Sequence, residues 1–329
     1  MISNKKKIAI TGVAGFIGSN LASRLLAEGY EVLGIDNLAY GLRENVPDGV
    51  RFDLKDIRNK EIYPLFQGVD TVFHFAAKNC IADCQADPVE TAEINVSGTV
   101  NVFEASRRAG VRKVVYAESS ALYEGSSIYP TPESDVKPES FYAVSKLASM
   151  YFAEAYQRFF GSKPSPHSSP LTPHGLSFTA LRYFCVYGPV QDYRRTIPPV
   201  MSAFIIKLLK GERPTIYGTG EKKRDFVYVD DVNDFHLICI RDDRTTGKTF
   251  NIGSGINYSV LEILDKISRI LGVNPDPMHK DDLPGEAQVT LADITQAKSL
   301  GWEPKTTLET GLERAIDYIR QEMAVGRIP

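Results

Sequence analysis

A run of spaced glycines close to the N-terminus constrains the fold of this chain more than any other feature. The apolar residues 8–10 lead into Gly12, Gly15 and Gly18, and leucines at helical spacing follow them. In such a strand–turn–helix, Gly12 takes the tight turn, Gly15 lets the backbone approach a pyrophosphate, and Gly18 lets the helix pack on the strand. The N–H groups that begin the helix then point at the phosphates. We therefore predict a dinucleotide-binding turn; the alternative is a tight turn that binds nothing.

Two acidic residues at the ends of later strands are candidates for binding the rest of a dinucleotide. Asp36 closes a strand predicted over residues 31–35 and lies about 20 residues after the glycines, where a carboxylate bonds the adenosine ribose. A carboxylate there accepts a hydrogen bond from a free 2′-hydroxyl and repels a 2′-phosphate, which favours NAD over NADP. Asp56, followed by Ile57, suits an adenine pocket; a bare surface turn is the alternative.

Strand and helix patterns alternate through the first half of the chain, which predicts an α/β fold with a Rossmann-type doubly wound parallel sheet. Further strands are expected over residues 69–77, 111–117 and 179–184, and helices over residues 95–109 and 141–159. From about residue 189 the alternation is lost. We therefore predict a first domain over residues 1–188 and a smaller mixed α/β C-terminal lobe over residues 189–329, with some elements crossing between the two.

Composition excludes several classes of protein. The 329 residues carry 38 Lys and Arg against 41 Asp and Glu, a net charge of −3 with no large basic block, so nucleic acid is not expected as a partner. No apolar run reaches the length of a membrane helix and nothing before Gly12 resembles a signal peptide, so we expect no membrane partner and a cytoplasmic location. The four cysteines lack paired metal-ligand spacing, and Cys80 and Cys84 are interpreted as small buried hydrophobes, so no metal site is expected.

Several polar residues are interpreted without a ligand. His74 lies inside an apolar run and is predicted to be a packed core histidine. The proline-rich segment 161–174 is predicted to be an exposed insertion. Its two histidines, which we expect to face solvent, are His167 and His174. Four cations mark the C-terminal end of the helix predicted over residues 95–109, where positive charge complements the helix dipole; they are Arg107, Arg108, Arg112 and Lys113.

A tyrosine and a lysine near the start of one predicted helix carry the chemistry. Tyr142 and Lys146 are four residues apart, so their side chains share a helix face. A phenol titrates near pH 10 and is a poor base at neutral pH, but a nearby ammonium and a positive nicotinamide ring lower its pKa. Ser119 or Ser120, at the end of the preceding strand, would hold the substrate oxygen against Tyr142. An exposed helix turn is the alternative.

The same features recur as a set of short motifs spread over nearly the whole chain. They are Thr11–Gly18, Asp36–Asn37, Asp56–Ile57, His74–Ala77, Asn95–Thr99, Tyr142–Lys146, Leu181–Pro189, Arg224–Asp231 and Leu300–Pro304. With these motifs the chain resembles the extended short-chain dehydrogenase/reductase superfamily, in particular its NAD-dependent nucleotide-sugar epimerase branch. The resemblance implies an NAD-binding domain that carries the Ser/Tyr/Lys site and a second lobe that binds a nucleotide sugar.

The resemblance also implies roles for individual residues. Tyr142 is the base, Lys146 its helper, and Ser119, four residues before Tyr123, the proton-sharing hydroxyl. The residues implied in NAD binding are Gly12, Gly15, Phe16, Ile17, Gly18, Asp36, Asn37, Asp56, Ile57, Phe75, Ala76, Ala77, Lys78, Asn95, Tyr142, Lys146 and Tyr183. Those implied in substrate binding are Lys78, Ser119, Ser120, Ala121, Tyr142, Cys185, Pro198, Tyr217, Arg224 and Glu286. Arg224 is expected at the diphosphate, because a guanidinium fork matches phosphate oxygens.

The implied reaction oxidises C4 of a nucleoside-diphosphate sugar, lets the 4-keto intermediate rotate, and returns the hydride to its other face. Relatives that dehydrate or decarboxylate carry acids where this chain has Ser120 and Ala121, and 3,5-epimerases need an acid/base pair that Leu122 and its neighbours do not supply. We therefore expect a 4-epimerase of UDP-glucose/UDP-galactose or UDP-GlcNAc/UDP-GalNAc. The alternatives are a nucleotide-4-ketosugar reductase and a non-catalytic NAD-binding regulator.

Three positions depart from the pattern of the superfamily. Cys185 stands where an Asn usually helps to hold the diphosphate, and Leu283 stands where an Arg commonly pairs with phosphate. Glu124 replaces a glycine, which reshapes the sugar pocket. Arg194 or Arg195 is a candidate to replace the missing arginine.

A homodimer is also expected. Helix 95–109 and the helix after Tyr142 carry apolar residues beyond one stripe, namely Val100, Phe103, Met150, Tyr151 and Tyr156. In the superfamily such helices pair across a two-fold axis into a four-helix bundle. The alternative is a monomer that buries them under its own lobe.

Overall fold

The computed structural model describes residues 6–161, 175–195, 197–282 and 286–328, and the chain forms two compact units. The first unit comprises residues 1–122, 137–182 and 233–250, and the second comprises residues 123–136, 183–232 and 251–329. The two units are therefore interleaved along the chain.

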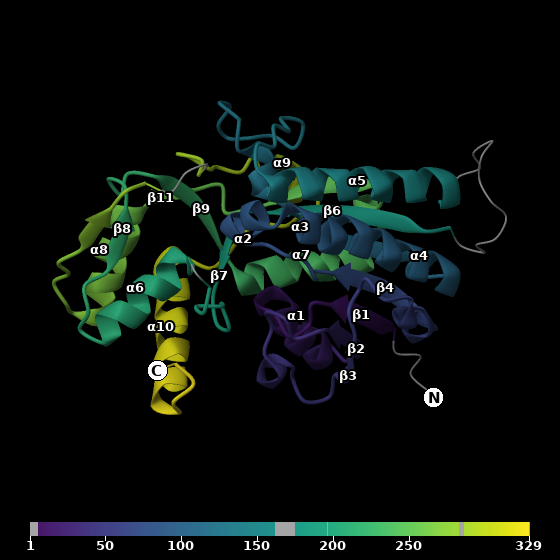
Figure 1. Cartoon of the computed structure of the whole chain (residues 1–329), viewed down its shortest axis with the longest axis horizontal. Coiled ribbons are helices and arrows are strands. Elements are labelled where there is room, and N and C mark those ends of the chain that lie inside the picture. The colour runs from purple at the N-terminus through teal and green to yellow at the C-terminus, as the bar shows by residue number, and fades with distance from the viewer. Residues whose placement is uncertain (1–5, 162–174, 196, 283–285, 329) are drawn as a thin grey trace. The chain divides into compact units, whose positions relative to one another are not determined.

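A mainly parallel sheet forms the framework of the first unit (Figure 1). Its seven described strands lie in the order β10-β6-β5-β4-β1-β2-β3. They are β1 Lys7–Thr11, β2 Glu31–Asp36, β3 Arg51–Leu54, β4 Val69–His74, β5 Lys113–Ser119, β6 Ser177–Tyr183 and β10 Lys248–Ile252. From β3 through β2, β1 and β4 to β5, neighbouring strands pair in parallel. The predicted Rossmann-type doubly wound sheet is confirmed.

Helices cover both faces of this sheet. They are α1 Phe16–Ala27, α2 Ile81–Ala86, α3 Pro88–Ala92, α4 Thr99–Ala109, α5 Phe141–Phe160 and α7 Val229–Arg241, and a π-helical turn over Glu93–Gly98 leads into α4. Successive residues of β4 point to opposite faces: Val72 belongs to a core cluster with Val102 of α4 and Ala153 of α5, whereas Phe73 meets the ring of His236 in α7, with centroids 5.3 Å apart. Because β1 ends at Thr11 and α1 begins at Phe16, the first turn of α1 lies at the carboxyl end of β1.

Most of the apolar side chains from which a dimer surface was predicted are not exposed on their helices. Phe103 and Met150 are buried in the core of the first unit, because they lie on the faces of α4 and α5 that pack on the sheet. Val100 and Tyr156 are only partly exposed, and Tyr156 packs against the same core. Of the five residues cited for a dimer surface, Tyr151 is the one whose side chain is exposed.

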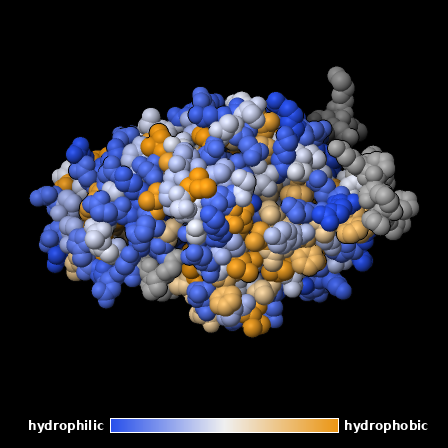
Figure 2. Space-filling model, turned by 90° about the horizontal axis from the view of Figure 1, so that it is seen from above, coloured by the Kyte–Doolittle hydropathy of each residue, from blue (hydrophilic) through white to orange (hydrophobic). Residues whose placement is uncertain are grey.

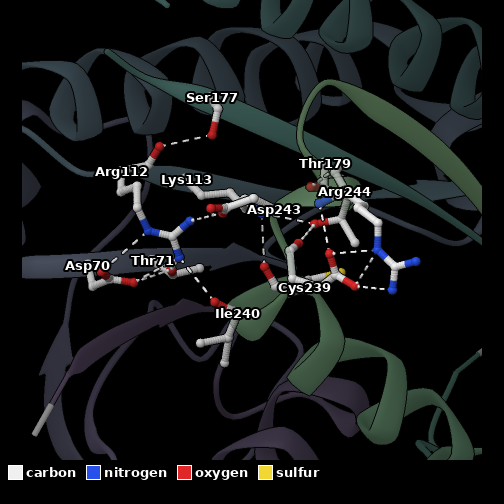
Figure 3. A network of polar contacts seen from close by, with 12 residues as sticks. Asp70, Thr71, Arg112, Lys113, Ser177, Thr179, Cys239, Ile240, Asp243 and Arg244 are labelled. Atoms are coloured by element: carbon white, nitrogen blue, oxygen red, sulfur yellow. Dashed lines mark hydrogen bonds and ion pairs between the residues drawn. The ribbon is translucent and has the colours of Figure 1, made fainter. Parts of the chain in front are cut away.

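Arg107 and Arg108 lie in the last turn of α4, as predicted, whereas Arg112 and Lys113 do not serve the helix dipole, because α4 already ends at residue 109. Lys113 opens β5 and Arg112 directly precedes it, and both join a polar network with β4 and α7 (Figure 3). The Lys113 side chain is fully buried, and its ammonium donates hydrogen bonds to the Cys239 carbonyl at 3.0 Å and to Thr245 Oγ1 at 2.9 Å. Arg112 pairs with Asp70 at 3.2 Å. Both cations therefore connect elements that are far apart in sequence.

The second unit is a smaller mixed α/β assembly, as predicted. Its described strands are β7 Cys185–Tyr187, β8 Thr215–Tyr217, β9 Lys223–Tyr228, β11 Asn257–Ser259 and β12 Met278–Lys280, and its helices are α6 Val200–Leu209, α8 Val260–Leu271, α9 Thr295–Lys298 and α10 Leu308–Ala324. In the sheet β11-β9-β7, β9 pairs in parallel with β7 and antiparallel with β11. A capping box of Ser259 and Glu262 begins α8.

Two acids of the Arg224–Asp231 motif stabilise the backbone of the second unit. Asp225 is fully buried and accepts hydrogen bonds from three backbone N–H groups, those of Ser254, Gly255 and Ala292. Asp231 accepts hydrogen bonds from the N–H groups of Lys305 and Thr306. Each carboxylate thus replaces water for amides that are remote in sequence, so these two motif residues are structural.

The prediction for His74 is confirmed. Its ring is buried between Thr11 Oγ1 at 2.7 Å and Thr99 Oγ1 at 2.9 Å, and burial lowers its pKa to about 3, so the ring stays neutral. Cys84 is buried as predicted, whereas Cys80 is partly exposed because it precedes α2. In the described residues there is no cluster of potential metal ligands and no helix that is both long and apolar enough to cross a membrane. His167, His174, most of the proline-rich segment and Leu283 lie outside the described residues.

Candidate active site

The glycine turn is built for close approach. Gly12 has a φ of +78°, and a Cβ on it would lie 2.7 Å from the Ala76 nitrogen. A Cβ on Gly18 would lie 2.2 Å from the Gly12 carbonyl oxygen, so only hydrogen fits where α1 packs on the turn. Gly15 precedes α1 and has no side chain to cover the N–H groups of its first turn. These residues fit a dinucleotide pyrophosphate bound on the helix N-terminus.

Asp36 both supports this turn and remains available to a ribose. Its side chain is buried, with Oδ2 accepting a hydrogen bond from the Ala14 N–H at 3.0 Å and Oδ1 accepting one from the Leu38 N–H at 2.8 Å. Burial raises the pKa of this carboxyl, and the backbone N–H groups oppose the rise. The Asn37 N–H also donates to this carboxylate, so about one of its four lone-pair sites remains for a ribose hydroxyl.

Asp56, the predicted adenine ligand, is paired with an arginine that the sequence analysis missed. Arg58 Nη2 lies 2.7 Å from Asp56 Oδ2 and its Nε lies 3.0 Å from Oδ1, and Asn37 donates to the same carboxylate at 2.9 Å. Hydrogen bonds from Arg58 lower the Asp56 pKa to about 2. The acid is therefore ionised and its oxygens are largely used within the protein, so the adjacent buried Ile57 is the better candidate for packing on adenine.

The segment that follows β4 is fixed by a reciprocal pair of hydrogen bonds. The Lys78 N–H donates to Asn95 Oδ1 at 2.8 Å, and Asn95 Nδ2 donates to the Lys78 carbonyl at 2.9 Å. Ala76 N–H donates to the Thr11 carbonyl at 3.1 Å, which brings this segment beside the end of β1. Lys78 is buried and its ammonium meets Glu90 at 2.5 Å, a partner that the sequence analysis did not predict. Phe75, Ala77 and the neighbouring Lys78 thus lie beside the glycine turn.

The predicted catalytic pair lies at the start of α5. Ser140 caps this helix, and Tyr142 and Lys146 follow one turn apart, both buried. Lys146 Nζ donates a hydrogen bond to the Ala117 carbonyl of β5 at 2.9 Å. The same nitrogen lies 5.2 Å from the centroid of the Tyr116 ring and 6.0 Å from that of Tyr142. The structure thus brings a buried ammonium beside the Tyr142 phenol ring.

Burial and a nearby carboxylate set the charge of Lys146. Burial lowers its pKa to about 8, and Glu118 opposes the change.

Ser119 is the last residue of β5, two residues beyond the predicted end of the strand, and its Oγ accepts a hydrogen bond from the Ala121 N–H at 3.1 Å. Because the oxygen is used as an acceptor, the Ser119 hydroxyl proton remains available to donate. Ser120 and Ala121 follow in a 3₁₀ turn and are partly exposed.

Three of the predicted substrate residues lie together in the second unit. Arg224 Nη2 lies 3.4 Å from Glu286 Oε2, and Cys185 interacts electrostatically with both. Desolvation raises the Cys185 pKa to about 11, so its thiol stays neutral. Lys222, which the sequence analysis missed, is buried and shares Glu286 at 3.1 Å. Lys222 also pairs with Asp282, so the cluster brings together two cations and two carboxylates.

The remaining predicted residues have simpler surroundings. Tyr217 ends β8, Pro198 lies two residues before α6, and Tyr183 is buried at the end of β6. Arg194 and Arg195, the candidates to replace the arginine absent at position 283, both pair with Asp192, at 3.1 and 3.5 Å.

Comparison with known proteins identifies the family to which these residues belong. Residues 8–253 match the model of the NAD dependent epimerase/dehydratase family. The chain belongs to this family. The UDP-glucose 4-epimerase of Mycolicibacterium smegmatis is 33% identical over 323 residues, covering 95% of this chain and 98% of the relative.

Solved structures of the same family have the same fold. The UDP-glucose 4-epimerase of Thermotoga maritima, solved with UDP-glucose, has a TM-score of 0.88 at 33% identity, covering 96% of this chain and 99% of the other. The Thermus thermophilus UDP-glucose 4-epimerase, solved with NAD, has a TM-score of 0.84 at 32% identity, covering 95% and 99%. The resemblance inferred from the motifs is confirmed, and the chain is an NAD-dependent member of this epimerase family.

One buried ion pair beside the candidate site had only a weak signal in the sequence. Glu118 stands in an otherwise apolar strand and pairs with Arg182, Nε to Oε2 at 2.7 Å, with both side chains buried. A lone acid in a buried strand indicates that a cation must lie nearby, but the partner is 64 residues away. The sequence alone therefore did not identify the pair.

Proposed function

We propose that this chain is an NAD-dependent nucleoside-diphosphate-sugar 4-epimerase that acts on UDP-glucose/UDP-galactose or UDP-GlcNAc/UDP-GalNAc. The observation that carries the proposal is the buried ammonium of Lys146 beside Tyr142, at the end of the strand that presents Ser119. A phenol in that setting becomes a base that works near neutral pH.

NAD fits the residues of the first unit. The closeness of Gly12 and Gly18 to backbone leaves no room for side chains at the turn, and Asp36 suits a free 2′-hydroxyl. Lys146 would also hold the nicotinamide ribose, since an ammonium has three donors. When bound, NAD supplies a reversible acceptor for the sugar hydride. We include the other residues named from the motifs for NAD binding in this site, those of the first unit together with Tyr183, the last residue of β6.

The protein residues then move one proton. Tyr142 takes the proton of the sugar C4 hydroxyl as that carbon loses its hydride, and Lys146 stabilises the phenolate that does so. Ser119 donates a hydrogen bond to the same sugar oxygen. The 4-keto sugar rotates, and Tyr142 returns the proton to the oxygen when the hydride is returned to the opposite face. Ser120 and Ala121 supply no acid for elimination or decarboxylation, so the reaction ends at the epimer.

The second unit would bind the nucleotide diphosphate. Arg224 and Lys222 are the cations that would meet the phosphates in exchange for their present partners Glu286 and Asp282, and Cys185 takes the place of an amide there. We propose the same division by function as the sequence analysis: residues 1–188 bind NAD and carry Ser119, Tyr142 and Lys146, and the lobe over residues 189–329, together with Cys185, binds the nucleotide diphosphate of the sugar. Arg194 and Arg195 remain candidates for an additional phosphate contact.

We also propose that the protein is a homodimer formed through α5 and α4. Apolar side chains gather on the face seen from above in Figure 2. Exposed side chains on α5 are Phe141, Val144, Tyr151, Phe152 and Phe159, with exposed fractions of 51%, 49%, 59%, 45% and 40%. A surface of this kind marks an interface, and a four-helix bundle covers it in both copies. A cytoplasmic location stays a prediction.

The test is a panel of UDP-, dTDP- and GDP-sugars incubated with purified protein and followed by NMR, without added NADH. Interconversion of C4 epimers is expected, with loss of turnover in Tyr142→Phe and retention of bound NAD. A nucleotide-4-ketosugar reductase would instead consume NADH in proportion to product. Normal NAD binding with no turnover of any sugar would favour a regulator and contradict the proposal.

A further inference from the structure

Strand β5 ends in a buried ion pair to which the proposed mechanism gives no role. The side chains of Glu118 and Arg182 are 0% and 3% exposed, and Arg182 Nε lies 2.7 Å from Glu118 Oε2. Glu118 stands between two residues of the candidate site. The preceding residue, Ala117, accepts the hydrogen bond from Lys146, and the following residue is Ser119. Glu118 is therefore the neighbour in sequence of both the acceptor of Lys146 and the proposed catalytic serine.

The pair also meets the stripe of α5 that carries the proposed catalytic residues. Arg182 Nη2 lies 3.6 Å from the sulfur of Met150, which is one helical turn beyond Lys146. Tyr116 and Glu118 are two residues apart on β5, so they share one face of the strand, and the Tyr116 ring lies 5.2 Å from Lys146 Nζ. The face of β5 that bears Glu118 is thus the face on which this part of α5 packs.

The charges around Lys146 come from three elements. Glu118 on β5 raises the Lys146 pKa, Cys84 on α2 acts in the same direction, and burial lowers it. His74 on β4 also interacts with Lys146, but burial keeps this histidine neutral. Among these groups, Glu118 is the carboxylate. It is the anion that can balance the buried ammonium.

The charges around Glu118 itself come from β6 and α5. Burial raises the pKa of Glu118, Glu154 acts in the same direction, and the cations of Arg182 and Lys146 oppose the rise. The second carboxylate oxygen, Oε1, is buried and accepts no hydrogen bond from the described residues. Most buried polar side-chain atoms have a hydrogen-bond partner, so this oxygen requires an explanation. The unsatisfied oxygen leaves negative charge to act through space.

We propose that Glu118 is a positioning residue for the epimerase site: its buried carboxylate, held by Arg182, maintains Lys146 as an ammonium and fixes the end of β5 that presents Ser119. The inference rests on the proposed function of Tyr142 and Lys146 and adds a residue to it. Glu118 touches neither substrate nor cofactor in this role. It acts through Lys146.

The test is a set of variants that change the charge of the pair, and the measurement is the pH dependence of kcat/KM for the epimerisation. Glu118→Gln removes a negative charge, which favours deprotonation of both Tyr142 and Lys146. Both limbs of the profile are therefore expected to move to lower pH, by about one unit. Arg182→Met is expected to move them to higher pH, and the double variant to return them towards wild type. Glu118→Asp, which keeps the charge, is expected to restore the wild-type limbs.

Unshifted limbs with only a lower maximal rate would mean that the pair is purely structural and would overturn the inference. If Glu118→Gln does not fold, comparison of Arg182→Met with the double variant isolates the same carboxylate. Ionised tyrosine absorbs in the ultraviolet, so the titration of Tyr142 can be followed without a sugar. It is obtained as the absorbance difference between each NAD-loaded variant and the same variant carrying Tyr142→Phe. If the wild type converts no nucleotide sugar, the proposed function fails, whereas a Tyr142 titration unchanged by Glu118→Gln overturns this inference alone.

Discussion

Strand β5 has a buried lysine near each end, and the two lysines have different partners. Lys113 opens the strand, and its ammonium donates to two acceptors, the Cys239 carbonyl and Thr245 Oγ1. Lys146 reaches the other end of the strand from α5, where the described residues provide one acceptor, the Ala117 carbonyl. Burial lowers the pKa of both lysines.

The difference shows that burial alone does not mark a functional lysine. Lys113 is enclosed by backbone and hydroxyl groups of its own unit, as Figure 3 shows, and its contacts hold β5 to α7. The Lys146 ammonium can donate further hydrogen bonds, and it lies near the Tyr142 phenol and interacts with the Glu118 carboxylate, both of which affect its protonation. We infer that the first lysine stabilises the fold, whereas the second serves the chemistry at some cost in stability. Four experiments test this contrast.

The largest effect is expected for Lys146→Met. The substitution removes the ammonium that supports the Tyr142 phenolate, so kcat is expected to fall by about 10²–10⁴-fold. Lys113→Met is the matched variant and is expected to keep kcat at the wild-type level. Steady-state kinetics at pH 7 on both proteins measure the difference. Equal losses of kcat in two folded proteins would remove the contrast.

Lys113→Met is expected to have its main effect on stability. It leaves the Cys239 carbonyl and Thr245 Oγ1 buried without their donor, which lowers the free energy of unfolding by about 3 kcal/mol. Urea denaturation measures this change. Lys248→Met, at an exposed position at the start of β10, is the control and is expected to stay within about 0.5 kcal/mol of wild type. A Lys113 variant as stable as this control would show that the network contributes nothing.

The pH dependence of stability provides the third test. The Lys146 pKa is about 8 in the folded chain, below its ordinary value of 10.5, so the unfolded chain binds more protons between these values. The buried ammonium therefore lowers the free energy of unfolding of wild type fully below pH 8, and this destabilisation disappears as the pH rises to about 10. Lys146→Met is expected to be more stable than wild type at pH 7, with an advantage that shrinks above pH 8. Urea unfolding of both proteins across this range measures it, and a constant difference would contradict the assignment.

The smallest effect is expected for Thr245→Val. It removes one of the two acceptors of Lys113 and leaves the carbonyl in place, so a loss of about 1 kcal/mol in the free energy of unfolding is expected. The same urea measurement, combined with Lys113→Met in a double-mutant cycle, gives the coupling between the two side chains. Fully additive losses would show that this hydrogen bond does not contribute to the network.

Much of the fold and part of the site were determined by local rules that a sequence displays directly. Alternating strands and helices predicted the parallel sheet, and the glycines predicted a turn that admits no side chain. Spacing by four residues placed Tyr142 and Lys146 on one stripe of α5, and an apolar run placed His74 in the core. Each of these depends on residues close in the chain, so each was predictable.

Only the tertiary structure decided which polar groups are paired. Glu118 meets Arg182 across 64 residues, and Lys113 meets the Cys239 carbonyl across 126. It also buried Phe103 and Met150 against the sheet and left other residues of α5 exposed. Sequence spacing cannot specify such contacts, because they arise when strands and helices that are remote in the chain pack together. Packing therefore determined which charges are enclosed by partners and which retain capacity for chemistry.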